Sequence, residues 1–302
     1  MQARNKLEEN FIKYLLLLCA VTAVFIITLL VVFIFRQGLP VFGEHGFLNI
    51  LLGKAWNPTA SIYGILPMTV GTFYVTFLAL LIGVPCGLAT AIFLAELAGE
   101  QVARVIRPAI ELLAAIPSVI YGLFGMVVIN ELIRYMERNW FLNYLPENYR
   151  WGYSVLSGAI VLAIMILPTI INISEDALRA VPRAYKEGAL ALGSTHFQTI
   201  FKVILPAAKS GIISAVVLAM GRALGETMAL IMVIGNVTML PQHGLWSIFA
   251  PVSTLTGVIA LEMGYAGPEH RAALFAVGVV LFCIIAFLNS VALLLIRRGV
   301  DN

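Results

Sequence analysis

The chain has 302 residues, of which 61% are hydrophobic and 12% are charged, and its formal net charge at pH 7 is +3. Soluble globular proteins carry about twice this share of charged residues, so the composition excludes a soluble domain and indicates an integral membrane protein. The small net charge gives no indication of nucleic acid as a partner.

Apolar segments that cross a membrane must be helical, because a helix satisfies its own backbone hydrogen bonds in lipid. The first such segment, residues 14–35, is free of charged residues and would form a helix of about 33 Å, enough to cross the hydrocarbon layer. It is longer than the apolar core of a cleaved signal peptide, so we expect it to be retained. The six predicted spans cover residues 14–35, 64–95, 110–130, 151–173, 211–235 and 272–296.

Two apolar segments do not have the length of an ordinary span. Residues 64–95 are too long for one perpendicular span and too short for two, which predicts one long helix that is bent or locally opened at Pro85. Residues 245–261 are short and interrupted by Pro251, so we expect an interfacial or re-entrant helix there and not a seventh span.

The basic residues orient the six spans. With both termini on the cytoplasmic side, the inner segments hold twelve Lys and Arg residues and the outer segments hold six, while Arg222 lies within a span. Cytoplasmic segments of membrane proteins are enriched in Lys and Arg, so this arrangement follows the positive-inside rule. A seventh span would move Arg297 and Arg298 to the outside, against that rule.

The longest inner segment, residues 174–210, has the pattern of two helices joined by a turn. Pro182 suits the first turn of a helix, and Gly193 suits a helix end. Apolar residues after the turn recur at helical spacing, and Pro206 then ends or bends the second helix. We therefore predict a structured helix–turn–helix and not a slack linker.

This segment resembles the cytoplasmic loop of ABC importer permeases, whose pattern is E-A-A, three residues, G, nine residues, I-x-L-P. The spacing is intact, although Gly188 replaces the first alanine and Val203 replaces the isoleucine. The residues that match the pattern or stand in for it are Glu187, Gly188, Ala189, Gly193, Val203, Leu205 and Pro206. Three stretches further resemble PstC-type permease subunits of phosphate ABC importers: WNPTASIYGILPMTVGT (56–72), ELLAAIPSVIYGLFG (111–125) and GRALGETMA (221–229).

The resemblance implies an all-α integral membrane protein with the type I ABC importer fold, which has a MetI-like permease core of five helices and here one extra N-terminal helix. Residues 1–64 would hold the cytoplasmic N-terminus, the first span and an outer segment. Residues 65–298 would form the permease domain, with the cytoplasmic coupling loop at 174–210 and an outer loop at 236–271. The chain would be a multi-pass protein of the bacterial inner membrane.

The resemblance also implies partners. This chain would form a heterodimer with a PstA-type permease, two ATPase subunits would dock on the coupling loop, and a soluble phosphate-binding protein would dock on the outer side. ATP and Mg would be bound by the ATPase subunits, with no cofactor in this chain. The sequence agrees, because it has no G-x-x-x-x-G-K-[ST] pattern for nucleotide phosphates.

Other functional classes find little support. The three cysteines and four histidines have no ligand spacing, so we predict no metal site. No catalytic set of carboxylates or histidines indicates an enzyme. An energy-independent channel or secondary transporter would have no use for the loop pattern. We expect the transmembrane, pathway-forming subunit of an ATP-driven inorganic phosphate importer; the alternative is a permease for sulfate or molybdate.

Arg222 and Glu226 are the two charges of the fifth predicted span, and their spacing of four would place them on one helical face. Burying either side chain in lipid would cost from roughly 2.5 kcal/mol upward, so both are expected to face protein or a cavity. They either neutralise each other and fix the packing, or Arg222 lines the pathway and binds the anion while Glu226 orients Arg222 or senses a substrate proton. Thr227 belongs to the same candidate pathway.

Two further residues could line the pathway. Glu111 lies near the inner end of the span at 110–130, where solvation explains it without a function. Ser118, in the same predicted helix, could line a pore or could serve helix packing. Glu96 and Glu262 are expected to be solvated helix ends.

Overall fold

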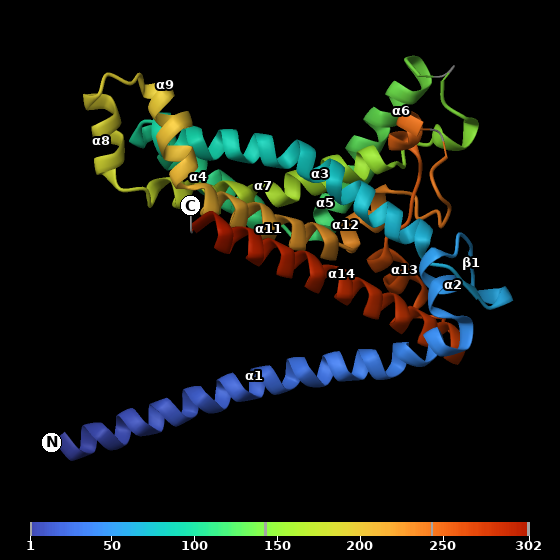
Figure 1. Ribbon diagram of the computed structural model, residues 1–302. Coiled ribbons are helices and arrows are strands. Elements are labelled where there is room, and N and C mark those ends of the chain that lie inside the picture. Colours follow the sequence, from blue (N-terminus) through green and yellow to red (C-terminus); the bar gives the residue numbers. More distant parts are fainter. Residues whose placement is uncertain (1, 142–143, 243, 301–302) are drawn as a thin grey trace.

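The computed structural model describes residues 2–141, 144–242 and 244–300, and most of this chain is helical (Figure 1). The first half comprises α1 Gln2–His45, α2 Phe47–Leu52, β1 Trp56–Asn57, β2 Ile62–Tyr63, α3 Leu66–Ile92, α4 Glu100–Ala115, α5 Ser118–Phe124 and α6 Asn130–Asn139. The second half comprises α7 Val155–Arg179, α8 Arg183–Ala191, α9 His196–Thr199, α10 Leu205–Ala207, α11 Lys209–Gly225, α12 Met228–Val233, α13 Leu255–Glu262 and α14 Pro268–Val300. Short π-helical turns cover Phe93–Leu97, Gly125–Ile129 and Ile200–Ile204, and 3₁₀ turns cover Pro58–Ala60, Glu147–Tyr149 and Gly244–Phe249.

The helices long and apolar enough to cross a membrane agree with the predicted count. Five qualify by themselves: Asn10–His45, Leu66–Leu97, Ser118–Asn139, Val155–Arg179 and Pro268–Leu294. A sixth crossing results if His196–Ala207 and Lys209–Gly225, which meet at an angle of 69°, form one span. The segment 245–261 is not a seventh, because it divides into the end of a 3₁₀ turn and the short α13.

The molecule has two distinct ends. The beginning of α1, the end of α14 and the pair α8–α9 lie at one end, here named the loop end, while α2 and β1 lie at the other, here named the hairpin end (Figure 1). The two termini thus share an end with the 174–210 segment, as they must if all three face the same side of a membrane. Which side that is remains a prediction from the basic residues.

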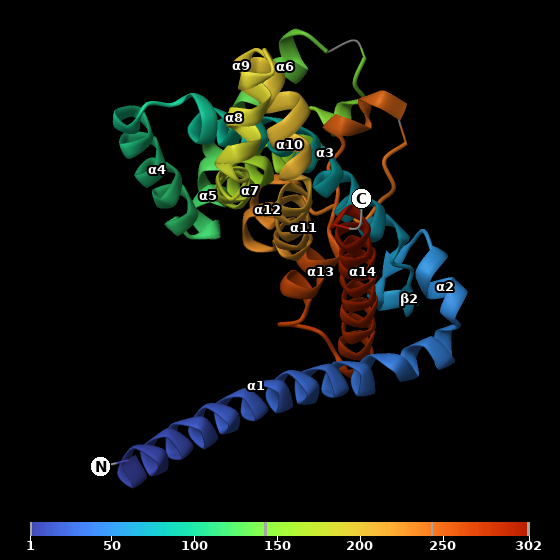
Figure 2. The same ribbon diagram turned by 60° about the vertical axis from the view of Figure 1, so that its left-hand side comes forward.

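The core of the body lies around α7, which packs against α3 and α11 (Figure 2). Gly83 and Gly87 of α3 face Ile166 and Ile170 of α7, and a Cβ added at Gly87 would lie only 2.7 Å from Cγ2 of Ile170. Small residues four apart let two helices approach closely, which is a common way of packing in membranes. By contrast, the most apolar 18-residue stretch of α1 has no buried residue, and α1 contacts α14 only toward its hairpin end, where Gly38 meets the backbone of the other helix (Figures 1 and 2).

At the hairpin end, a two-stranded hairpin that the sequence reading did not foresee pairs Trp56 with Tyr63. Nε1 of Trp56 donates a hydrogen bond to Oε2 of Glu262 at 3.0 Å, and Nε2 of His270 lies 2.7 Å from the same oxygen. Glu262 is therefore not the solvated helix end that its position predicts, since it ties the hairpin to α13 and α14. Burial raises the pKa of the Tyr63 hydroxyl, and the charge of Glu269 raises it further.

The span expected at residues 110–130 is wrong in its boundaries. The helix stops at Ala115, Ile116 is extended with φ −68° and ψ 127°, and a new helix begins at Ser118. Pro117 explains the break, because it has no N–H to donate and it disfavours helical geometry in the residue before it. The crossing helix is therefore Ser118–Asn139, and α4 is a separate amphipathic helix.

The helix expected at residues 211–235 is also broken. α11 ends at Gly225, Glu226 is extended with φ −68° and ψ 132°, and α12 begins at Met228. No proline marks this break; glycine is a poor helix former, and the side chain of Glu226 helps begin the next helix. By contrast, α3 continues without a break through Pro85, and its departure from α geometry comes later, at Phe93–Leu97.

We predict that Gly87→Val separates α3 from α7 and lowers stability by about 1–3 kcal/mol, the usual effect of overpacking a core. The measurement is the apparent Tm of the detergent-purified protein. Gly43→Val is the matched control, because Gly43 lies in helix α1 with no atom within 4 Å of an added Cβ. Equal melting temperatures for the two variants would contradict the close α3–α7 contact.

Candidate functional site

Arg222 lies in the last turn of α11, on a face that the rest of the described chain leaves uncovered. Its side chain is exposed, and the flanking Gly221 and Gly225 have no atom within 4 Å of an added Cβ. Its one hydrogen bond within the described residues is long, from Nη1 to Oγ1 of Thr169 on α7 at 3.4 Å. The guanidinium thus keeps most of its donors free.

Glu226 does not pair with Arg222, so the predicted shared helical face is wrong. Oε1 of Glu226 accepts a hydrogen bond from the backbone N–H of Ala229 at 3.1 Å, and its carbonyl accepts one from Oγ1 of Thr256 at 2.9 Å. Thr227 closes the same break by donating its hydroxyl hydrogen to the carbonyl of Gly225 at 3.2 Å. Both residues thus shape the turn between α11 and α12.

The two helix breaks bring α5 and α12 together. A Cβ added at Gly122 would lie 2.8 Å from Sδ of Met232 and 3.0 Å from Cα of Ala229. Tyr121, one residue earlier, donates its hydroxyl hydrogen to the carbonyl of Leu113 at 2.6 Å, which satisfies a backbone group near the first break.

Ser118 and Glu111 belong to different helices, contrary to the sequence interpretation. Ser118 is half-exposed at the beginning of α5. Glu111 is exposed on α4 and lines a recess with Arg107, Asn172, Glu175, Asp176 and Arg179. Arg222 is not among the residues that line this recess. Glu111 thus belongs to the loop end, and the structure gives it no contact with Arg222.

The 174–210 segment begins within α7, which extends to Arg179, so the predicted loop starts too early; the segment then continues as the exposed helix α8. Glu187 and Gly188 are exposed, Ala189 is half-buried, and Gly193 ends the helix with a φ of +86°. That left-handed conformation favours glycine, so the predicted helix stop is confirmed. Leu192, next to it, is 89% exposed, so the loop presents an apolar side chain to its surroundings.

The second half of the loop is anchored to the body by apolar packing. Ile200 and Ile204 are buried against Ala91 at the end of α3 and Leu178 at the end of α7. Val203 and Leu205 are half-buried and Pro206 is exposed. The bend predicted at Pro206 is confirmed, because the two helices on either side of Ala208 meet at 69°.

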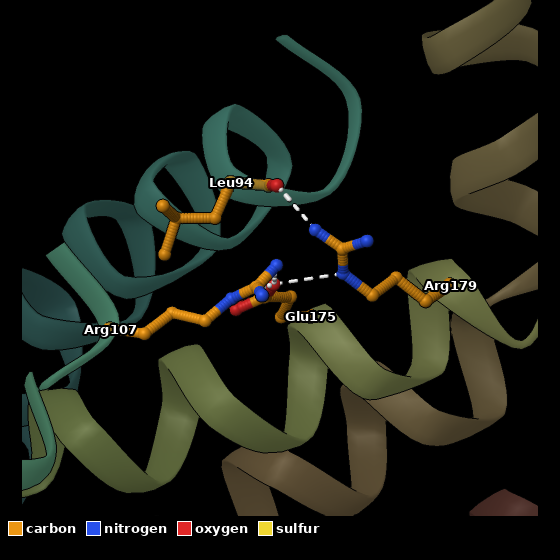
Figure 3. A network of polar contacts seen from close by, with 4 residues as sticks. All are labelled: Leu94, Arg107, Glu175 and Arg179. Carbon is orange, nitrogen blue, oxygen red and sulfur yellow. Dashed lines mark hydrogen bonds and ion pairs between the residues drawn. The ribbon is translucent and has the colours of Figure 1, made fainter. Parts of the chain in front are cut away.

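A buried carboxylate that the sequence reading missed joins three segments at the loop end (Figure 3). Oε1 of Glu175 accepts hydrogen bonds from Nη2 and Nε of Arg107 at 2.6 and 3.0 Å and from Nε of Arg179 at 2.8 Å. Nη2 of Arg179 also donates to the carbonyl of Leu94 at 2.7 Å. The spacing of four between Glu175 and Arg179 indicates this pair in a helix, whereas no sequence pattern links Glu175 to Arg107.

Glu96 is not a solvated helix end. Its side chain is 9% exposed, and its Oε2 lies 2.6 Å from Nζ of Lys186 on α8. The carbonyl of Glu96 lies 3.4 Å from Nε2 of His196 at the beginning of α9. Polar contacts at the loop end thus gather around two carboxylates, Glu175 and Glu96.

Comparison with known proteins agrees with this architecture. Residues 83–299 match the family described as "Binding-protein-dependent transport system inner membrane component". The chain is 40% identical to the probable ABC transporter permease protein YqgH of Bacillus subtilis over 92% of this chain and 87% of that protein. It is also 40% identical to the phosphate transport system permease protein PstC of Pasteurella multocida over 85% of this chain and 82% of that protein.

Solved structures show the same fold at low sequence identity. A chain of a bacterial alginate ABC transporter, determined with a periplasmic protein bound to an alginate pentasaccharide, matches with a TM-score of 0.63 at 18% identity, covering 95% of each chain. A chain of the inward-facing MetNI methionine ABC transporter matches with a TM-score of 0.55 at 19% identity, covering 78% of this chain and 94% of that one. The family match, which covers most of the chain, shows that this protein belongs to the binding-protein-dependent transport system inner membrane components, as a multi-pass membrane permease.

Proposed function

We propose that this chain is the pathway-forming membrane subunit of an ATP-driven importer of inorganic phosphate. Relatives named as phosphate transport permeases are similar to it over most of its length, and the helix–turn–helix at 183–207 has the form expected of a coupling loop. Because the chain has no nucleotide-binding pattern, ATP and Mg would be bound by partner ATPase subunits.

The observation that carries the proposal is the guanidinium of Arg222 in a membrane-spanning region, which is exposed and has no ion-pair partner among the described residues. Facing lipid would cost from roughly 2.5 kcal/mol upward, so the bare face of α11 is expected to border protein or a water-filled path. A guanidinium stays charged and matches phosphate oxygens with two parallel N–H groups. An anion that reaches this point would therefore find free donors.

The neighbouring residues support Arg222 in ways that differ from the sequence interpretation. The carboxylate of Glu226 accepts the N–H of Ala229 in the first turn of α12 and does not pair with Arg222, so the charge of Arg222 stays available to an anion. Thr227 holds the turn, and Ser118 is partly exposed at the neighbouring break. In this proposal Arg222 binds the anion, while Glu226 and Thr227 fix the backbone that presents it.

The proposed assembly adds a second permease, two ATPase subunits and a binding protein to this chain. A homologous PstA-type permease would cover the bare face of α11 and complete the pathway as a heterodimer. Two ATPase subunits would provide the energy, one of them contacting α8 through Glu187 and the turn at Gly193. A soluble phosphate-binding protein would deliver the anion at the hairpin end, and both termini would be cytoplasmic.

The test of substrate is ATP-dependent uptake of labelled phosphate into liposomes that hold the whole complex with its binding protein, measured with excess sulfate or molybdate. Uptake that survives both competitors is the expected result. Uptake that either competitor abolishes, or no phosphate uptake with robust sulfate or molybdate uptake, would assign the chain to another oxyanion.

We predict that Arg222→Ala lowers phosphate uptake at least about 30-fold, the lower limit for truncating a desolvated charge that binds an opposite charge. Arg222→Lys should retain part of the uptake, because lysine keeps the positive charge. It should not retain all of it, because lysine lacks the two parallel N–H donors of the guanidinium. Arg36→Ala is the control, since Arg36 is exposed on α1. Size-exclusion chromatography checks assembly; normal uptake by an assembled Arg222→Ala complex would overturn the role.

We predict that Gly193→Val uncouples ATP hydrolysis from uptake, whereas Gly193→Asn does so much less. Both side chains have free space, because no atom lies within 4 Å of an added Cβ, but the φ of +86° strains a β-branched residue and is tolerated by asparagine. The measurement is phosphate-stimulated ATPase activity together with uptake. Equal behaviour of the two variants would show that the backbone conformation at this turn does not matter.

A further inference from the structure

Helix α8 is attached to the rest of the chain without buried side chains. None of its residues is buried, whereas the α9 side of the loop buries Ile200 and Ile204 against the spans. A cavity of about 410 Å³ separates α8 from the ends of α3 and α7, lined among others by Glu96, Arg179 and Leu190. Apolar packing therefore does not fasten α8 to the spans.

One ion pair crosses this cavity. Nζ of Lys186 lies 2.6 Å from Oε2 of Glu96, and their side chains are 34% and 9% exposed. Among the described residues, no other hydrogen bond or ion pair joins a side chain of α8 to a spanning helix. A nearly buried carboxylate with a charged partner forms a much stiffer contact than an exposed surface pair, because losing the partner would leave the charge desolvated.

Glu96 lies in a π-helical turn at the end of α3. Phe93–Leu97 closes with a hydrogen bond from the N–H of Ala98 to the carbonyl of Phe93 at 2.7 Å. The same turn is contacted by Arg179 of α7 at the carbonyl of Leu94, and by His196 of α9 at the carbonyl of Glu96. Single π-turns inside α-helices are often functional, since they open the backbone to outside partners.

We propose that the Lys186–Glu96 ion pair is the link by which α8 moves α3, so that both are positioning residues for transport. The inference rests on the proposed function, in which an ATPase displaces α8. A displacement of α8 toward or away from the spans is passed through the ion pair to the π-turn and then along α3, which packs closely on α7 at Gly83 and Gly87. Without the pair, α8 moves within its cavity and α3 does not follow.

The first test measures coupling in liposomes holding the whole complex: labelled phosphate taken up per ATP hydrolysed. Lys186→Met and Glu96→Gln should each lower this ratio at least about fivefold, the lower range of coupling between two sites. The exchanged pair, Lys186→Glu with Glu96→Lys, should regain most of it, which a loss of local stability alone would not explain. Wild-type ratios in both single variants, or an exchanged pair no better than either, would overturn the proposal.

Matched controls lie close by. Lys202→Met removes an exposed lysine from the α9 side of the loop, and Glu100→Gln removes an exposed carboxylate at the beginning of α4, four residues after Glu96. Neither residue has an ion pair among the described residues, so both variants should keep the wild-type ratio. A fall of the ratio in the controls as large as in the single variants would mean that charge at the loop end, and not this pair, sets the coupling.

The second test needs no transported anion. Spin labels at Ala184→Cys on α8 and Leu97→Cys on the π-turn, with Cys19, Cys86 and Cys283 replaced by alanine, report the α8–α3 distance in the nucleotide-free and vanadate-trapped complex. The distance should stay constant with the pair intact and shift between states in Lys186→Met. Identical behaviour with and without the pair would overturn the inference. Absence of phosphate uptake by the wild-type complex would contradict only the proposed substrate.

Discussion

A backbone N–H or C=O group inside a membrane has no water to bind, and this constraint governs where the chain can depart from helical structure. Both breaks in the body obey it. The hydroxyl of Tyr121 binds the carbonyl of Leu113 before the first break, and the hydroxyl of Thr256 binds the carbonyl of Glu226 at the second. Each irregular stretch thus brings its own polar side chains.

Because of the same constraint, charged residues have different roles at the loop end and in the middle of the molecule. At the loop end, carboxylates at Glu96 and Glu175 are paired with cations from other helices, so charge holds segments together there. In the middle, Arg222 has no carboxylate partner within the described part of the chain and lies on an uncovered face. A charge used for structure is neutralised within the chain, whereas a charge kept for an anion is left open.

The sequence predicted what depends on hydrophobicity and on local chemistry. The five helices that qualify alone as crossings, the loop with its glycine stop at Gly193 and the absence of a seventh span follow from runs of apolar residues and from proline and glycine. The break at Pro117 also has a signal in the sequence, since a proline disfavours the helical conformation of the residue before it.

Other features could not be read because they depend on which helices become neighbours. The spacing of Arg222 and Glu226 indicated a pair only under the assumption of an unbroken helix, and glycine at position 225 is too weak a signal to reject it. Glu96 looked like a solvated end because its partner lies 90 residues later in the chain. Long-range pairing of this kind is a property of the packed structure.

The bare apolar surface beside Gly193 has a consequence for the life of the protein in the cell. Leu192 and Phe197, 89% and 69% exposed, lie in the loop and would meet water when nothing docks there. Such patches are what chaperones and proteases recognise on incomplete proteins. A copy of this chain without a docked partner would therefore be short-lived, and the supply of partners would set how many copies persist.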